Sequence, residues 1–101
     1  MSRLEKKPDL MSAVRTCIEE GHYLDTRHAA ERQGERQINR PEILYVLKNG
    51  HQEKKKDKFD EFYNAWSYAI RGRTVDRREL RVIVSFDANG MLIITAIELK
   101  K

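Results

Sequence analysis

The spacing of apolar residues divides the chain into a helical first half and a strand-forming second half. In the first segment apolar residues recur at helical intervals: Leu10, Val14, Cys17 and Ile18. Pro8-Asp9 before them and Gly21 after them are typical of the start and the end of a helix. We therefore predict an amphipathic helix over residues 10–20, with one face packed against the rest of the protein.

Two further helices are predicted before residue 50. Thr26 is a good N-cap and Gly34 a natural end for a short helix, which residues 22–25 join to the first one. Asn39 and Pro41 open the next helix, and Asn49-Gly50 closes it. Its buried stripe is supplied by Ile43, Leu44, Val46 and Leu47.

After Gly50 the apolar period changes to about two, which indicates β-strands. Strands are predicted over residues 65–71, 80–86 and 91–99, with a hairpin turn at 87–90, and residues 51–56 are a candidate polar edge strand. Helices followed by strands predict an α+β fold, in which N-terminal helices pack on one face of a C-terminal antiparallel sheet of three to four strands. Residues 1–8 are expected to form a flexible arm, and residues 9–101 a single domain.

The composition is that of an ordinary globular domain with a charged surface. The chain has 101 residues, 40% hydrophobic and 36% charged, and a formal net charge of +4, which favours an anionic partner. The single Cys17 cannot form an internal disulfide, and the N-terminus has no apolar signal segment, so we expect a cytoplasmic protein with no membrane partner. The histidines lack the spacing of zinc sites, and we predict no metal and no cofactor.

The segment from Thr26 to Arg32 is the strongest candidate for chemistry in the first half. With Thr26 as the N-cap, His28 and Arg32 stand four residues apart and share one helix face, within reach of one phosphate or one substrate hydroxyl. An imidazole exchanges protons near neutral pH, and a guanidinium binds phosphate. Two interpretations stay open: these residues act in catalysis, or they order the junction between the helices and the sheet.

A second group of basic residues brackets the connection between two predicted strands: Arg71, Arg73, Arg77, Arg78 and Arg81. Guanidinium forks on a sheet face suit phosphate binding and the stabilisation of charge that develops at phosphorus. Arg77 and Arg78 are flanked by acidic residues, and for these two we favour a solvated hairpin tip. For Arg71 and Arg81, which alternate with strand hydrophobics, the functional and the solvated interpretations are equally open.

Other side chains complete the candidate set. The phenol of Tyr68 can act as an acid or a base, although on the face of Trp66 it also suits packing with its hydroxyl at the rim. Lys54 begins an interrupted basic run that would contact phosphate, guard a sheet edge against aggregation or form a flexible loop. The expected RNA-contacting residues are Arg27, Arg36, Lys54 and Arg73.

Several catalytic motifs are missing from the sequence, including a glycine-rich phosphate loop, a nucleophile elbow and a spaced carboxylate cluster for two metals. The remaining histidine, arginine and tyrosine residues suit metal-independent RNA cleavage, in which the neighbouring 2′-hydroxyl is the nucleophile. In the leading hypothesis His28 is the general base or acid, Arg32 and Arg71 hold the scissile phosphate, and Arg81 stabilises the transition state. Tyr68 is a reserve candidate for proton transfer.

The order of these pieces resembles a known family. Thr26-Arg27-His28-Ala29 with Arg32, the helix 41–50, the run Trp66-Ser67-Tyr68-Ala69-Ile70-Arg71-Gly72-Arg73 and the final strands resemble the domain of unknown function 4258 family. That family is similar in pattern to the RelE-like toxins, especially the motility quorum-sensing regulator toxin. The resemblance covers nearly the whole chain from about Asp9. It implies a RelE-like fold.

The function implied by this resemblance is that of a bacterial type II toxin, a ribonuclease that cuts messenger RNA and is neutralised by an antitoxin encoded beside it. The toxin resembled uses two lysines, a glutamine and a tyrosine on and around its sheet. Lys54 matches the first lysine by approximate register, whereas Ser67 falls near the glutamine. The tyrosine and the second lysine are also replaced, so a catalytic version of this chain would use the His and Arg set named above.

Two other functions fit the same residues. A non-catalytic module would dock RNA or an acidic protein segment on the basic face, and its RNA binding would be strongly salt-dependent without cleavage. A protein-interacting subunit would instead pair its returning strand or a sheet edge with a strand of a partner.

Overall fold

The computed structural model describes residues 5–26, 38–62 and 64–99, and within them the chain forms an α+β fold. The helices are α1 (Leu10–Glu20) and α2 (Arg40–Asn49), and η2 (Lys54–Lys56) is a single 3₁₀ turn. The strands are β1 (Tyr23–Asp25), β2 (His51–Gln52), β3 (Lys58–Asp60), β4 (Ala65–Arg73), β5 (Glu79–Asp87) and β6 (Gly90–Leu99).

Both helices begin and end where the sequence predicts. The side chain of Asp9 caps α1 by accepting a hydrogen bond from the backbone N–H of Ser12, and Gly21 ends it in a left-handed conformation with φ of 75°. At the start of α2, Asn39 and Glu42 form a reciprocal capping box, with distances of 3.0 and 3.1 Å between each backbone nitrogen and the opposite side-chain oxygen.

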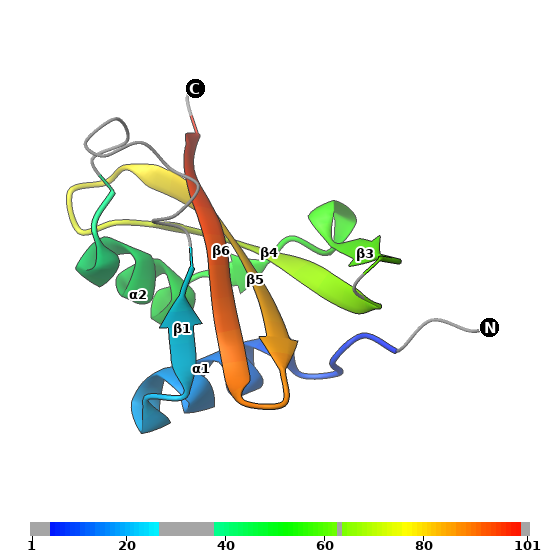
Figure 1. Cartoon of the computed structure of the whole chain (residues 1–101). Helices are drawn as coiled ribbons and strands as arrows, with labels where there is room; N and C mark the ends of the chain where they lie inside the picture. Colours follow the sequence, from blue (N-terminus) through cyan, green and yellow to red (C-terminus); the bar gives the residue numbers. More distant parts are fainter. Residues whose placement is uncertain (1–4, 27–37, 63, 100–101) are drawn as a thin grey trace.

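The strands form one mixed six-stranded sheet in the order β1-β6-β5-β4-β2, with β3 paired to the outer part of β4. The pairs β4–β5 and β5–β6 are long and antiparallel, whereas β1 runs parallel to β6. The chain therefore places its last strand in the interior of the sheet, between β1 and β5. The short β3 runs beside the first residues of β4, and in Figure 1 it lies away from both helices.

The core lies between the helices and one face of the sheet. Alternate residues of the central strands, such as Ile70, Val82 and Val84, are fully buried against side chains of α1 and α2. Close approach is required where α2 ends over β4, because a Cβ at Gly50 would lie 2.4 Å from the carbonyl oxygen of Arg71. The intervening strand residues point to the other face, which neither helix covers.

The sheet differs from the sequence expectation in strand number and direction. Three to four antiparallel strands were expected, but the sheet has six and is mixed. Residues 23–25, expected to be a connection, form β1, because β6 supplies a parallel partner 68 residues later that no local pattern reveals (Tyr23 pairs with Met91). The candidate edge strand at 51–56 is a two-residue strand followed by η2. The helix predicted over 26–34 lies outside the described residues, apart from Thr26.

The N-terminal segment contacts the end of the sheet at which β4 begins. The ammonium of Lys6 lies 2.8 Å from a carboxylate oxygen of Asp57 and 5.0 Å from the ring centre of Trp66. The backbone N–H of Lys7 donates to the hydroxyl of Tyr68 at 3.0 Å. Residues 5–8, part of the predicted arm, therefore run across aromatic side chains of the sheet.

Candidate nucleic-acid interface

The open face of the sheet carries a row of three basic side chains. His51 on β2 is paired with Arg71 on β4, and Arg71 is paired with Arg81 on β5. Directly paired residues of antiparallel strands point to the same face. The row therefore places an imidazole and two guanidiniums side by side on the face that the helices leave open.

Glu53 holds the two arginines of this row together. Arg81 donates to its carboxylate from Nε at 2.6 Å and from Nη2 at 3.3 Å, and Arg71 donates from Nη1 at 3.4 Å. The second end of Arg71 donates to Glu79 at 2.8 Å. These contacts orient both guanidiniums and use only part of each fork of N–H donors.

The charges of this cluster stabilise one another. The hydrogen bond from Arg81 is the main reason why the pKa of Glu53 is lowered, and Arg71 acts in the same direction. The hydrogen bond to Glu79 raises the pKa of Arg71. The side chains of Arg71 and Arg81 remain 35% and 20% exposed, so the row is held in place and accessible to an anion.

The structure brings together some of the residues predicted from sequence and separates others. Arg71 and Arg81 are neighbours on one face, as a shared phosphate site requires. Tyr68 lies on the opposite face, is 3% exposed and forms an edge-to-face contact with Phe86, so its phenol does not reach the arginine row. Lys54 lies in the exposed η2 turn, and Arg73 is exposed at the end of β4. The other predicted site residues lie outside the described residues: Arg27, His28, Arg32 and Arg36.

Three residues of the row and its ion pairs were not among the sequence candidates: His51, Glu53 and Glu79. Of these three residues His51 matters most for the site, because it supplies an imidazole beside Arg71. The signal available in the sequence was its position directly after the helix-ending Gly50, at the start of an expected edge strand. Its partner strand could not be read from that signal, since the pairing joins residues 20 positions apart, His51 and Arg71.

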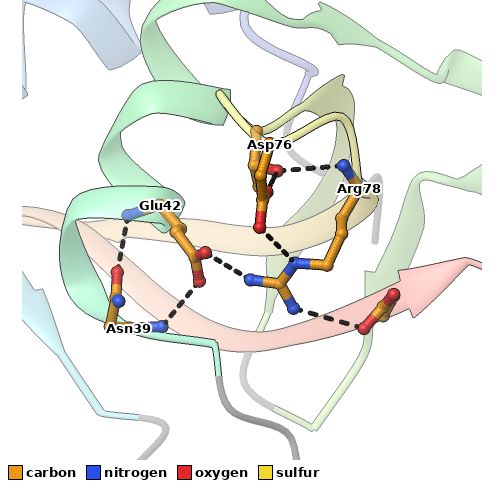
Figure 2. A network of polar contacts seen from close by, with 6 residues as sticks. Asn39, Glu42, Asp76 and Arg78 are labelled. Atoms are coloured by element: carbon orange, nitrogen blue, oxygen red, sulfur yellow. Dashed lines mark hydrogen bonds and ion pairs between the residues drawn. The ribbon is translucent and has the colours of Figure 1, made fainter.

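A second cluster of charged residues surrounds Arg78, in the loop that joins β4 to β5. Arg78 contacts three carboxylates, those of Glu42 on α2, Asp76 in the hairpin loop and Glu98 on β6 (Figure 2). One oxygen of Glu42 caps its own helix, and the other accepts a hydrogen bond from Arg78. The bond to Glu42 is the main cause of the raised pKa of Arg78. The expected solvated position of Arg78 is wrong, because its side chain joins three elements and is only 24% exposed.

The hairpin loop holds Arg78 in place through Thr74. Thr74 is 4% exposed, accepts a hydrogen bond from the backbone N–H of Arg78 at 3.0 Å and donates from its hydroxyl to Asp76. That bond is the main reason for the lowered pKa of Asp76. Arg77, between Asp76 and Arg78, has a positive φ of 71° and an exposed side chain, as expected for the hairpin tip.

Within residues 5–26, 38–62 and 64–99 no helix is long and apolar enough to cross a membrane. The same residues contain no group of three or more His, Cys, Asp or Glu side chains arranged to hold a metal ion.

The family of the chain follows from a match over residues 26–98 to the model described as a domain of unknown function, DUF4258. This match covers the arginine row, the Arg78 cluster and all strands after β1, and the chain belongs to that family. No curated protein and no solved structure matches the chain.

Proposed function

We propose that this protein is a metal-independent endoribonuclease that cleaves messenger RNA on the open face of its sheet. The observation that carries the proposal is the row of His51, Arg71 and Arg81, fixed by Glu53 on a face that neither α1 nor α2 covers. A proton-transfer group beside two phosphate-binding forks is the minimum that such a reaction needs.

The reaction uses the ribose next to the scissile phosphate. A base removes the proton of the 2′-hydroxyl, and the 2′-oxygen forms a bond to phosphorus. The bond from phosphorus to the 5′-oxygen then breaks, and an acid donates a proton to that oxygen. The products are a 2′,3′-cyclic phosphate and a free 5′-hydroxyl, and no oxidant, reductant or metal is consumed.

Each residue of the row has a role that its position supports. Arg71 and Arg81 bind the phosphate and neutralise the charge that develops on it. Glu53 already holds both guanidiniums in position, and their N–H groups that do not contact Glu53 or Glu79 are the donors to the phosphate. His51 exchanges the proton. Glu53 acts as a positioning residue, because its carboxylate already holds both guanidiniums. His28 and Arg32 stay as predicted second contributors, one to proton transfer and one to phosphate binding.

The toxin assignment is part of the same proposal and rests on the resemblance to RelE-like proteins. In this proposal the protein acts in the cytoplasm of a bacterium and is neutralised by an antitoxin that covers the basic face. The net charge of +4 supports an acidic antitoxin segment as well as RNA. Growth arrest on induction, relieved by the adjacent gene, tests this part independently of any cleavage assay.

The catalytic part is tested with the purified full chain and a single-stranded RNA in the presence of EDTA. We expect cleavage that leaves cyclic phosphate ends, and we expect His51→Ala to reduce its rate at least about a hundredfold, the usual loss for a general acid or base. His28→Ala measures the contribution of the second predicted histidine. His22→Ala is the matched control, because His22 is exposed and its ring contacts Glu20 of α1 rather than the arginine row.

A non-catalytic RNA-binding module is the second candidate. It is favoured by the position of Tyr68, which removes one predicted acid or base from the open face and leaves His51 as the imidazole there within the described residues. Salt-dependent RNA binding by the wild type, with no cleavage and no effect of His51→Ala, would select this candidate over the enzyme.

A further inference from the structure

A groove lies beside the arginine row on the open face of the sheet. Its floor is formed by Ser67 on β4, Ile83 on β5 and Ile97 on β6. The segment from η2 to β3 forms one wall, with Lys56, Lys58 and Phe59 among its lining residues. The groove has a volume of about 730 Å³ and is open along one side, so it can admit a group from a chain that lies across the sheet.

The groove and the arginine row are adjacent in the strand register. Ile97 is directly paired with Arg81, and Ile83 follows Arg81 by two residues on the same face. The rise of a strand places Ile83 about 7 Å along β5 from Arg81. The apolar floor therefore begins at Ile97, beside the fork of Arg81, and reaches Ile83 one residue pair further along. This separation is comparable to that between the base and the phosphate of one nucleotide.

From this juxtaposition we infer that the groove binds an unstacked nucleobase of a single-stranded RNA whose phosphate lies on Arg81. The base stacks on the side chains of Ile83 and Ile97, because a nucleobase presents a flat apolar face. Lys56 and Lys58 contact the backbone of the next nucleotide on the wall side. This inference rests on the RNA-binding part of the proposed function and does not require cleavage.

The charges around the groove also indicate on which side of it the RNA backbone lies. Asp60 and Glu61 line the end of the groove that belongs to β3 and the turn after it, and their carboxylates repel a phosphate there. The cations lie at the other end and on the wall. A base is accommodated between these groups, whereas the backbone is directed toward Arg81 and Arg71.

Double-stranded RNA does not satisfy this arrangement. A paired base is stacked inside the duplex, and its face cannot reach the floor of the groove without leaving its partner. We therefore expect the protein to prefer single strands, and we expect the preference to depend on the groove and not on the arginine row alone.

The test uses the full chain, one unmodified short single-stranded RNA and a series of the same RNA in which one position at a time is replaced by an abasic ribose. The position whose replacement weakens binding by the wild type is the critical base. Ile97→Thr keeps a β-branched residue in β6 and removes apolar floor. We expect it to weaken binding of the unmodified RNA about tenfold, the scale of one lost base-stacking contact. We expect no change in its affinity for the RNA with the critical base removed. Ile94→Thr is the matched control, because Ile94 lies at the irregularity of β6, is 36% exposed and does not line the groove.

The outcomes separate this inference from the proposed function. If Ile97→Thr weakens both RNAs equally, or neither, while the wild type binds RNA through Arg81, the nucleobase groove is overturned and the RNA-binding face stands. If the wild type binds neither RNA, both are overturned. Thermal unfolding of Ile97→Thr and Ile94→Thr reports whether the variants are equally folded. If Ile97→Thr is too unstable, Ser67→Leu, which fills the floor from β4, gives the same comparison against the abasic RNA.

Discussion

The two arginine clusters at the β4–β5 hairpin differ in charge balance. Arg78 meets three carboxylates, from α2, the hairpin loop and β6, so that cluster has an excess of negative charge. Arg71 and Arg81 pair with two carboxylates: both contact Glu53, and Arg71 also contacts Glu79. The second cluster is balanced in itself and has His51 at one end of the row.

This difference separates a structural use of arginine from the binding use that we propose for Arg71 and Arg81. An excess of carboxylates neutralises Arg78 and repels a phosphate, and the contacts join three elements that are distant in sequence (Figure 2). In the open-face cluster the carboxylates orient the guanidiniums without outnumbering them. Residue type alone does not distinguish the two clusters, since their arginines lie before, within and after the same hairpin loop in sequence.

The largest effect on stability is expected for Arg78→Ala. It leaves Glu42, Asp76 and Glu98 without their shared cation, and we expect the free energy of unfolding to fall by about 2 kcal/mol, the scale of charged hydrogen bonds lost in a part-buried site. Urea denaturation measures this. Arg77→Ala is the matched control, because it removes the same charge from the exposed neighbouring position. Equal stability of the two variants would contradict a structural role for the Arg78 cluster.

Arg81→Ala is expected to have its main effect on RNA affinity. The loss of a fork directed at phosphate weakens binding of single-stranded RNA about tenfold and reduces the salt dependence by about one ion. Arg77→Ala again serves as control, since both variants lose one positive charge. Fluorescence anisotropy at several salt concentrations measures both quantities. An equal loss of affinity in the two variants would mean that only net charge matters.

A smaller effect is expected for Glu53→Gln, and it depends on pH. The pKa of Glu53 is lowered in the folded protein, so its contribution to stability is complete above the ordinary value of 4.5 and is lost as the pH falls through the lowered pKa. We expect Glu53→Gln to be about 1 kcal/mol less stable than the wild type at pH 7. The gap should close below pH 4.5. Glu19→Gln on the exposed surface of α1 is the control for general charge effects, and a gap independent of pH would refute the ion-pair account.

The smallest effect concerns the N-terminal segment. Trp66 is the single tryptophan of the chain, and the ammonium of Lys6 lies over its ring. We expect Lys6→Ala to change the emission of Trp66 and to lower stability by less than about 1 kcal/mol, because Asp57 keeps its hydrogen bonds from Ala69 and Gln52. Lys55→Ala in the exposed η2 turn should leave the emission unchanged. Identical spectra for Lys6→Ala and the wild type would exclude the contact with Trp66 in solution.

The sequence predicted the elements whose causes are local. Asp9 and Gly21 set the ends of α1, Asn39 and Gly50 those of α2, and alternation revealed the three long strands. It did not predict β1, since three residues carry no period and the pairing with β6 is parallel and distant.

The candidate site was predicted in part for the same reason. Arg71 and Arg81 were identified because basic residues interrupt apolar strands, which is a local signal. The contribution of Glu53 and His51 depends on which strand lies beside β4, and this is decided by tertiary pairing. Arg78 was misassigned because its flanking acids suggested solvation, whereas the deciding partners, Glu42 and Glu98, are far away in sequence.

The interior position of β6 has a consequence for synthesis of the protein on the ribosome. While residues up to 89 are emerging, β1 has no strand to pair with and β5 lacks one of its two neighbours, so the sheet described above cannot be completed. The sheet is completed only when β6, the strand synthesised last, pairs with β1 and β5. This long-range step is expected to be slower than formation of the helices. An unfinished chain thus has its arginines but not the sheet on which they are displayed.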